Sequence, residues 1–227
     1  MVSVLEVPSL VDAVQQAMRV RILDGRISPG VAVTEVSVAN EFSVARTTAK
    51  AAVERLVHDG LLRRAANKSA RVPVLDLDEV RDVYFSRGLL EATVMRRLAQ
   101  DGQIPADAKA ALQRFDIAVD QGEQSQVVES DVAFHRALVD SLGSERVSRI
   151  YQSLMGEAQL CMAQMQYLRL LDPRLIATEH AAIVAAIEAR DPVLAVAMLE
   201  THLNNASSRI IAVLEKQANG QEADEPE

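Results

Sequence analysis

Residues 22–64 read ILDGRISPGVAVTEVSVANEFSVARTTAKAAVERLVHDGLLRR, and this stretch decides the fold of the first part of the chain. Ser28-Pro29-Gly30 has the composition of a turn. Thr34 can then cap a short helix that runs to about residue 41, and a tight connection leads into a helix over residues 45–58. The apolar face of that second helix consists of Ala49, Ala52, Val53 and Leu56. The pattern predicts a helix–turn–helix.

The segments on either side extend this motif to a domain. Ser9 can cap an earlier helix, with Asp12 three positions on and Gly25 at its end. After the helix–turn–helix, residues 61–64 and 70–75 read as two short strands around a polar loop. The order of helix, helix–turn–helix and β-hairpin predicts a winged helix–turn–helix domain over residues 1–75.

Charge is distributed unevenly along the chain. The net charge is −8, but residues 1–75 carry +3 and residues 76–227 carry −11. A basic module joined to an acidic body is typical of a DNA reader with a separate sensing domain. Cys161 is the single cysteine, which excludes an internal disulfide. We see no pattern of a signal peptide or a membrane span, so we expect a cytoplasmic protein without a membrane partner.

The start of the second helix carries the candidate DNA contacts. In a helix–turn–helix, the first residues of this helix meet base edges in the major groove. Arg46 and Lys50 are four positions apart and share a face, and both side chains can reach guanine. The expected DNA-contacting set is Arg46, Thr47, Thr48, Lys50, Thr34 and Lys68. By pattern alone, an exposed helix with ordinary solubilising charges is an equal alternative.

The same stretch resembles the winged helix domain of the GntR superfamily of bacterial regulators. The family pattern lies on residues 22–61 without a gap, with matches at Pro29, Gly30, Ala39, Val44, Arg46, Thr47, Leu56, Gly60 and Leu61. The resemblance implies a transcription regulator, usually a repressor, that binds a palindromic operator in double-stranded DNA. It also implies a homodimer associated with the nucleoid in the bacterial cytoplasm.

Three departures from the family pattern affect the expected DNA contacts. Ala45 replaces the family's serine, which removes a good helix cap. Lys50 replaces an arginine and cannot make the same bidentate contact. The wing tip, residues 67–70, lacks the glycine that lets a backbone approach DNA closely. The operator sequence therefore cannot be inherited from relatives.

The chain after residue 75 has the pattern of a continuous series of helices. Asp78 is expected to cap the first, and the pairs Asp172-Pro173 and Asp191-Pro192 to open the last two. The pattern predicts an all-α antiparallel bundle of six helices over residues 76–218, followed by a disordered acidic tail over residues 219–227. The expected fold class is mainly α, with one small β-hairpin in the winged domain.

Three histidines and one aspartate in this bundle form a candidate metal site. Asp131 and His135 are one helical turn apart, so both project from one face. His180 and His202 lie on the last two helices beside apolar residues, which places them near the inside of the bundle. Spacing alone leaves two interpretations about equal: one metal centre, or three separately satisfied histidines.

The second half of the chain also resembles a known domain, the FCD domain of the FadR group of GntR regulators. Asp131-x-x-Phe134-His135 matches its D-x-x-F-H motif, and Arg87-x-x-x-Glu91 is similar to its first helix. The six expected helices are similar to the shorter, VanR-like subgroup. The resemblance implies that Asp131, His135, His180 and His202 bind a divalent metal. One carboxylate and three imidazoles suit zinc or nickel.

The resemblance further implies a small-molecule effector, which we expect to be a carboxylate bound at the metal. Arg87 and Glu91 are the candidate effector-binding pair, and a structural ion pair between them is an equal alternative. Two other functions compete with an effector-responsive regulator. One is a helical metalloenzyme with an accessory DNA-binding domain, although the sequence has no HExxH motif. The other is a regulator whose metal is purely structural.

Overall fold

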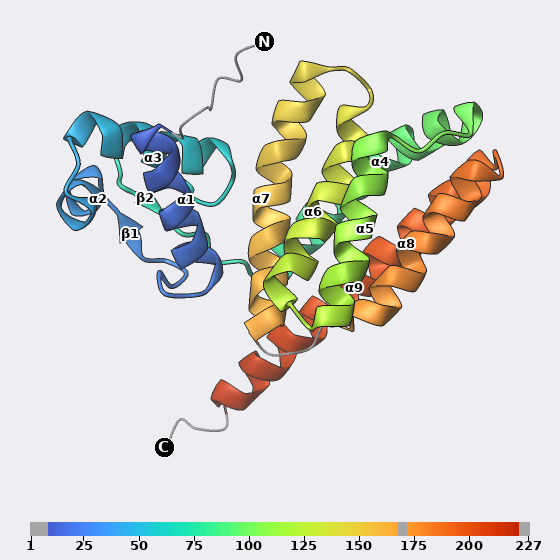
Figure 1. Ribbon diagram of the computed structural model, residues 1–227. Coiled ribbons are helices and arrows are strands. Elements are labelled where there is room, and N and C mark those ends of the chain that lie inside the picture. The colour runs from blue at the N-terminus through green and yellow to red at the C-terminus, as the bar shows by residue number, and fades with distance from the viewer. Residues whose placement is uncertain (1–8, 168–171, 223–227) are drawn as a thin grey trace, which may run out of the picture. The chain divides into compact units, whose positions relative to one another are not determined.

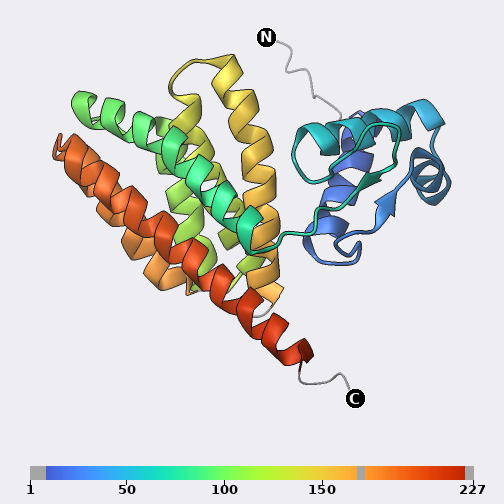
Figure 2. The same cartoon turned by 180° about the vertical axis from the view of Figure 1, so that it is seen from behind.

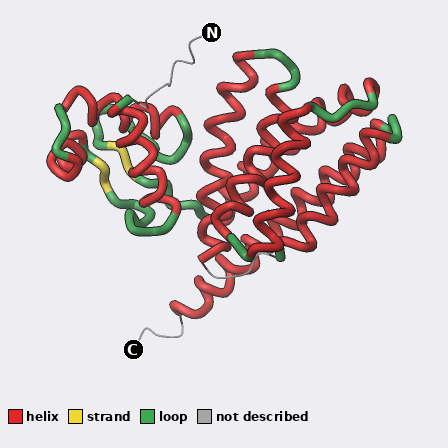
Figure 3. The backbone as a smooth tube through the Cα atoms, in the orientation of Figure 1, coloured by secondary structure: helices red, strands yellow, loops and turns green. Residues whose placement is uncertain are grey.

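The computed structural model describes residues 9–167 and 172–222, with the side chains of 164–167 and 217–222 excepted. The chain divides into two compact units, residues 1–74 and 75–227. Figure 1 shows that the first holds α1 to α3 and both strands, and the second holds α4 to α9. Helix dominates the described residues, with two short strands (Figure 3), which confirms the predicted fold class. No described helix combines the length and the apolar character that a membrane span requires.

The three helices of the N-terminal unit start and stop at local sequence signals. Their bounds are α1 Leu10–Leu23, α2 Glu35–Phe42 and α3 Arg46–His58. Ser9 and Asp12 form a capping box at the start of α1, and Thr34 and Ser37 form another at the start of α2. Ser43 ends α2 with a φ of 52°, so the chain turns directly into α3. The predicted caps Ser9 and Thr34 are confirmed.

The core of the N-terminal unit is built around α3. Its predicted apolar face is fully buried, with 0% exposure at Ala49, Ala52, Val53 and Leu56. Both α1 and α2 pack against this face, and α1 contributes Val14, Met18 and Ile22. Packing therefore leaves the opposite side of α3, with its basic residues, in solvent.

The wing is smaller than predicted, and its strands pair differently. Strand β1 (Ala32–Val33) runs antiparallel to β2 (Ala70–Arg71). Of the predicted partner strand 61–64, only Arg63 pairs with β2, through one isolated bridge. The reason is local, because the N–H groups of Leu61 and Leu62 both donate to the Leu56 carbonyl at the end of α3. They are therefore not available to a sheet.

The second unit is a bundle of long helices. Their bounds are α4 Leu77–Asp101, α5 Ala106–Gln121, α6 Gln124–Asp140, α7 Glu145–Tyr167, α8 Pro173–Glu188 and α9 Pro192–Glu222. Figure 2 shows α4 and α9 lying side by side, and α5 packs along α6. A cluster of apolar residues that includes Phe115, Val127 and Ile176 joins α5, α6 and α8. This packing places the inner faces of α4, α6, α8 and α9 in the core.

Two predictions about helix ends in this unit are wrong: the cap of α4 and the end of α9. Asp76, not Asp78, caps α4, since its side chain accepts the N–H groups of Asp78 and Glu79. Asp78 lies inside the first turn, where its carboxylate still faces the positive end of the helix dipole. Helix α9 continues to Glu222, so residues 219–222 are helical rather than disordered, and residues 223–227 lie outside the described part. The predicted caps Asp172 and Asp191 both accept two backbone N–H groups.

Candidate metal centre and DNA-binding surface

The four residues expected to bind metal meet in the core of the C-terminal unit. Asp131 and His135 come from α6, His180 from α8 and His202 from α9, and none is more than 5% exposed. One potential ligand atom from each lies within 4.8 Å of the others. Three helices, of which α8 and α9 are consecutive in the chain, thus supply a carboxylate and three imidazoles to one small volume.

Two glutamates fix which ring nitrogens point into the cluster. Glu91 lies 2.7 Å from Nδ1 of His135, and Glu179 lies 2.8 Å from Nδ1 of His202. A carboxylate only accepts, so each Nδ1 carries the proton and donates it. In the neutral form of each ring, Nε2 then presents a lone pair. The two Nε2 atoms face each other 3.1 Å apart. Two lone pairs at that distance repel unless a cation lies between or beside them.

The other two ligands leave buried polar atoms without partners. Among the described residues, Oδ2 of Asp131 has no hydrogen-bond partner, and neither ring nitrogen of His180 has one. Oδ1 of Asp131 lies 3.2 Å from Nε2 of His180, but these two atoms do not have the geometry of a hydrogen bond. An unsatisfied buried polar group costs about 1–3 kcal/mol. The donor set therefore fits a bound cation better than it fits a network of hydrogen bonds.

The charge states in the cluster also suit a cation. Burial would raise the pKa of Asp131, but attraction to the surrounding histidines, with His180 first, holds it well below its usual range. Burial lowers the pKa of His202 to about 4, although the hydrogen bond that its Nδ1–H donates to Glu179 opposes this shift. Burial likewise lowers the pKa of His180. An ionised carboxylate and neutral imidazoles are the forms that bind metals.

A second set of buried groups supports Glu91. Its Oε1 accepts hydrogen bonds from Nε of Arg87 at 2.9 Å and from the hydroxyl of Tyr151 at 2.8 Å. Both Arg87 and Glu91 are 0% exposed. Burial would raise the pKa of Glu91, but Arg87 and His135 hold it well below its usual range. Arg87 and Glu91 thus form an ion pair, which is one of the two alternatives that the sequence left open. Its two Nη nitrogens have no hydrogen-bond partner among the described residues.

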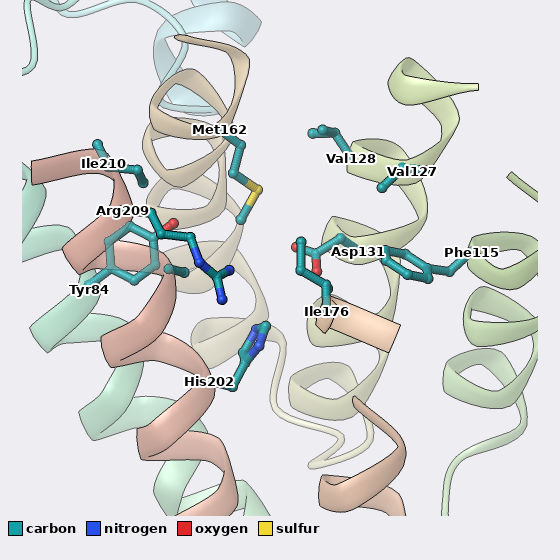
Figure 4. Close-up of a pocket in the computed structure, with 11 residues that line it drawn as sticks. Tyr84, Phe115, Val127, Val128, Asp131, Met162, Ile176, His202, Arg209 and Ile210 are labelled. Atoms are coloured by element: carbon teal, nitrogen blue, oxygen red, sulfur yellow. The ribbon is translucent and has the colours of Figure 1, made fainter. Parts of the chain in front are cut away.

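A cavity opens beside two of the candidate metal ligands, Asp131 and His202 (Figure 4). Its polar lining comes from Tyr84, Asp131, His202 and Arg209, and the rest of the lining is apolar. In Figure 4, the side chain of Arg209 extends from α9 and lies between Tyr84 and His202. Arg87 is not among the lining residues of this cavity.

Helix α7, which contributes to the lining of this cavity, carries three methionines and the single cysteine. Met155 is buried, and Met162 lines the cavity. The side chain of Met165 lies outside the described residues. Cys161 is fully buried, and burial raises the pKa of its thiol to about 12. This thiol is therefore not a nucleophile.

Sequence reasoning missed Glu179 and Arg209. Glu179 adjoins His180 in the sequence, and adjacent side chains on a helix point about 100° apart. Glu179 thus points away from His180, but it reaches His202 on α9. Arg209 lies 3.3 Å from Glu179, seven positions after His202 and two helical turns along α9. Helical spacing from His202 was a signal that could have found it.

The expected DNA-contacting residues lie on the N-terminal unit. Arg46 and Thr47 are exposed at the start of α3, and Thr48 is half-buried. Lys50 is exposed and lies 3.8 Å from Glu54, an ion pair weak enough for DNA to replace. The start of α3 thus presents two cations and two hydroxyls on its outer side.

The wing and the start of α2 hold the remaining expected contacts. Ala45 precedes α3 without a side-chain cap, as predicted. Asn67 has a φ of 60°, so it takes the left-handed conformation that a wing glycine would otherwise provide. Lys68 follows it and is exposed, and its N–H donates to the Ala65 carbonyl to close the turn. The hydroxyl of Thr34 caps α2.

Comparison with known proteins assigns both units. The model of the bacterial regulatory proteins of the gntR family matches residues 10–72, and the FCD domain model matches residues 82–205. The gluconate operon transcriptional repressor of Bacillus subtilis is 23% identical over 199 residues, which cover 85% of this chain and 82% of the relative. The transcriptional repressor RspR of Escherichia coli is 22% identical and covers 81% of each chain.

A solved structure agrees with both models over nearly the whole chain. The GntR-type transcriptional regulator from Rhodococcus sp. RHA1 has a TM-score of 0.72 at 25% identity, and the match covers 90% of this chain and 99% of that one. These relatives regulate transcription and are not enzymes, which removes the metalloenzyme alternative. The chain therefore belongs to the GntR family of bacterial regulatory proteins, carries an FCD domain, and is a transcription regulator.

Proposed function

We propose that this regulator is a repressor that responds to an effector and depends on a metal held by Asp131, His135, His180 and His202. The observation that carries the proposal is the set of unpaired donor atoms in a buried core. Nε2 of His135 faces Nε2 of His202 at 3.1 Å, and Asp131 and His180 have buried atoms without partners. One divalent cation satisfies all of them together.

Zinc or nickel suits this donor set. Three imidazoles and one carboxylate are ligands for borderline divalent ions. Glu91 and Glu179 orient two of the imidazoles, and such outer partners typically change metal affinity by about 10- to 100-fold. A bound ion would supply a Lewis acid that attracts a carboxylate. The six helices α4 to α9 support the VanR-like subgroup for this domain.

The effector is a small carboxylate that enters the cavity next to Asp131 and His202. This position follows from the cavity lining, since these two ligands face the open space. Glu91 acts through His135, which it holds in place. Arg87 holds Glu91, and its two unpartnered Nη nitrogens are the part of it that a deeply bound effector oxygen would contact.

The N-terminal unit reads a palindromic operator as part of a homodimer. The exposed start of α3 supports contact by Arg46 and Lys50 with base edges or phosphate. Dimer symmetry then requires two equivalent half-sites. Repression is the direction that the gluconate operon repressor and RspR support. The operator places the protein on the chromosome, in the bacterial cytoplasm.

A purely structural metal is the second candidate, and the burial of all four ligands favours it. The two candidates differ in what the effector does. An effector changes DNA affinity only if it binds one arrangement of the protein better than another. A structural metal would stabilise the bundle without any such preference.

Metal content and operator binding test the proposal together. The full chain, purified without a metal-affinity column, should contain about one divalent ion per chain by mass spectrometry. His180→Ala should lose this ion and the response to carboxylates, while binding to DNA selected in vitro persists. His58→Ala is the matched control, because His58 is the fourth histidine and lies exposed in the other unit. A chain that neither contains nor takes up zinc or nickel would exclude the metal.

A further inference from the structure

The cavity beside the candidate metal ligands is lined mostly by apolar side chains. Its polar lining is limited to Tyr84, Arg209 and the two candidate ligands Asp131 and His202. The apolar lining includes Phe115, Val127, Val128, Met162, Ile176 and Ile210. None of these side chains can donate or accept a strong hydrogen bond. The cavity therefore matches a molecule that is charged at one end and hydrocarbon over the rest.

We propose that the effector is a monocarboxylate with an unsubstituted alkyl or aryl body, and not a polyhydroxylated sugar acid. This inference rests on the proposed function and specifies its effector. It also assigns Arg209 as the residue that binds the carboxylate alongside the metal. The apolar lining argues against a sugar acid such as gluconate as the effector of this chain, although one relative is named a gluconate operon repressor.

Arg209 is placed to release its present partner for a ligand. Among the described residues, its polar contact is a 3.3 Å approach of Nη2 to Oε1 of Glu179. That oxygen also accepts a 2.8 Å hydrogen bond from Asn205, and the other oxygen of Glu179 is held by His202. Glu179 therefore stays satisfied when Arg209 turns away. A guanidinium can bind a carboxylate with two parallel hydrogen bonds.

Tyr84 adds a hydroxyl that has no hydrogen-bond partner in the part of the chain that the structure describes. The residue is 5% exposed, and its hydroxyl oxygen is buried. Tyr84 carries the one hydroxyl group in the lining, so it can form a hydrogen bond with one oxygen of the effector at most. Further ligand hydroxyls would lie against Val127, Val128 or Ile210 without partners. Each such hydroxyl costs about a factor of ten or more in affinity.

The size of the cavity favours the shorter acids. Its volume is about 30 Å³, which is room for about two water molecules. Met162 and Arg209 are the flexible side chains in its wall, and they must move for a longer body. We therefore expect butyrate to fit with the least rearrangement.

Pairs of acids with the same carbon chain test the inference directly. Butyrate is compared with threonate, and hexanoate with gluconate, by calorimetric titration of the zinc-loaded full chain. The unsubstituted acid of each pair should bind at least about tenfold more tightly. Val128→Thr keeps the side-chain shape and adds a hydroxyl, so it should narrow this ratio. Arg209→Gln should weaken butyrate binding about tenfold or more while the zinc content stays unchanged.

The outcomes separate this inference from the proposed function. Gluconate binding as tightly as hexanoate, in a zinc-dependent way, would overturn the inference and leave the metal-dependent effector site intact. No binding of any of the four acids to a chain that holds zinc would also overturn it. A chain without metal affinity that still prefers butyrate to threonate would keep the inference and remove the metal. Equal butyrate affinity in the Arg209→Gln variant would remove Arg209 from its assigned role.

Discussion

The two units of this regulator place their candidate functional residues in opposite environments. In the N-terminal unit the candidate DNA contacts on α3 lie on the surface, and the core beneath them is apolar, with Asp59 as the one buried charged residue among those described. In the C-terminal unit the candidate metal ligands lie within the core itself. Its buried polar side chains are Arg87, Glu91, Ser130, Asp131, His135, Gln159, His180 and His202.

This difference shows at which residues a substitution can change function without changing stability. An exposed arginine on α3 can change without disturbing the apolar packing beneath it. A ligand in the C-terminal core cannot change without leaving a neighbour unpaired, because Glu91 and Glu179 each serve several partners. We therefore expect changes at the exposed residues of α3 to alter DNA affinity alone. Changes at the buried polar residues of the C-terminal unit should alter folding and binding together.

We expect the largest change in the free energy of unfolding when the buried ion pair between Arg87 and Glu91 is broken. Glu91→Gln removes the charge that compensates Arg87 where both side chains are 0% exposed. Removing one partner of a buried pair costs about 3–5 kcal/mol. Urea unfolding followed by circular dichroism should therefore show a loss of this size.

The control for this prediction lies on the same helix. Arg81 pairs with Asp78 at 3.0 Å, but both side chains are more than half exposed. Arg81→Gln should cost less than about 1 kcal/mol. Similar losses in the two variants would contradict the contrast between a buried and an exposed pair.

The next effect is a dependence of folding stability on pH in the metal-free chain. Burial lowers the pKa of His202 to about 4 from an ordinary 6.5. Between these values the unfolded chain binds a proton that the folded chain does not. Stability is therefore full above pH 6.5, falls as the pH drops, and levels off near pH 4. The loss attributable to this group is about 3 kcal/mol.

A variant identifies the group responsible for the pH dependence. Burial lowers the pKa of His180 in the same direction, so both histidines contribute with the same sign. His202→Asn should flatten the dependence of unfolding free energy on pH. If the metal-free chain became more stable on acidification through this range, the burial of neutral histidines would be refuted.

A smaller effect is expected on DNA affinity. Arg46→Ala removes an exposed side chain at the start of α3 and should weaken specific binding by about 1–3 kcal/mol. Unfolding should change by less than about 0.5 kcal/mol, as for other exposed positions. Fluorescence anisotropy and thermal unfolding of the same sample measure both. Arg26→Ala is the control, since Arg26 is exposed and pairs with Asp24 after α1. An equal loss in both variants would remove Arg46 from the interface.

Sequence reasoning predicted the features whose causes are local. The caps at Ser9 and Thr34 depend on a partner three residues away, and both were found. The assignment of Asp78 failed because Asp76 is an equally good cap two positions earlier. Strand β1 was missed because two residues carry no alternation to detect. Local signals thus determine where elements begin, but not which of two adjacent signals is used.

The candidate site shows the same limit at longer range. Asp131 and His135 share a helical face, so their pairing was readable from spacing. That His180 and His202 meet them required a family resemblance. Spacing from His202 could have placed Arg209 on the same side of α9, but its contact with Glu179 depends on how α8 and α9 align side by side. The same alignment brings Glu179 to His202, and no spacing within α8 predicts that contact.

The smallest expected effect concerns the wing, where the family's glycine is absent. Asn67 holds a φ of 60°, which asparagine tolerates and a β-branched residue does not. Asn67→Gly should leave stability within a few tenths of a kcal/mol, because ease of adopting this conformation offsets the added flexibility of the unfolded chain. Asn67→Val should cost about 1–2 kcal/mol through strain. The two variants, compared by thermal unfolding, therefore separate backbone conformation from side-chain chemistry. If Asn67→Gly lost DNA affinity at unchanged stability, the asparagine amide itself would be a contact.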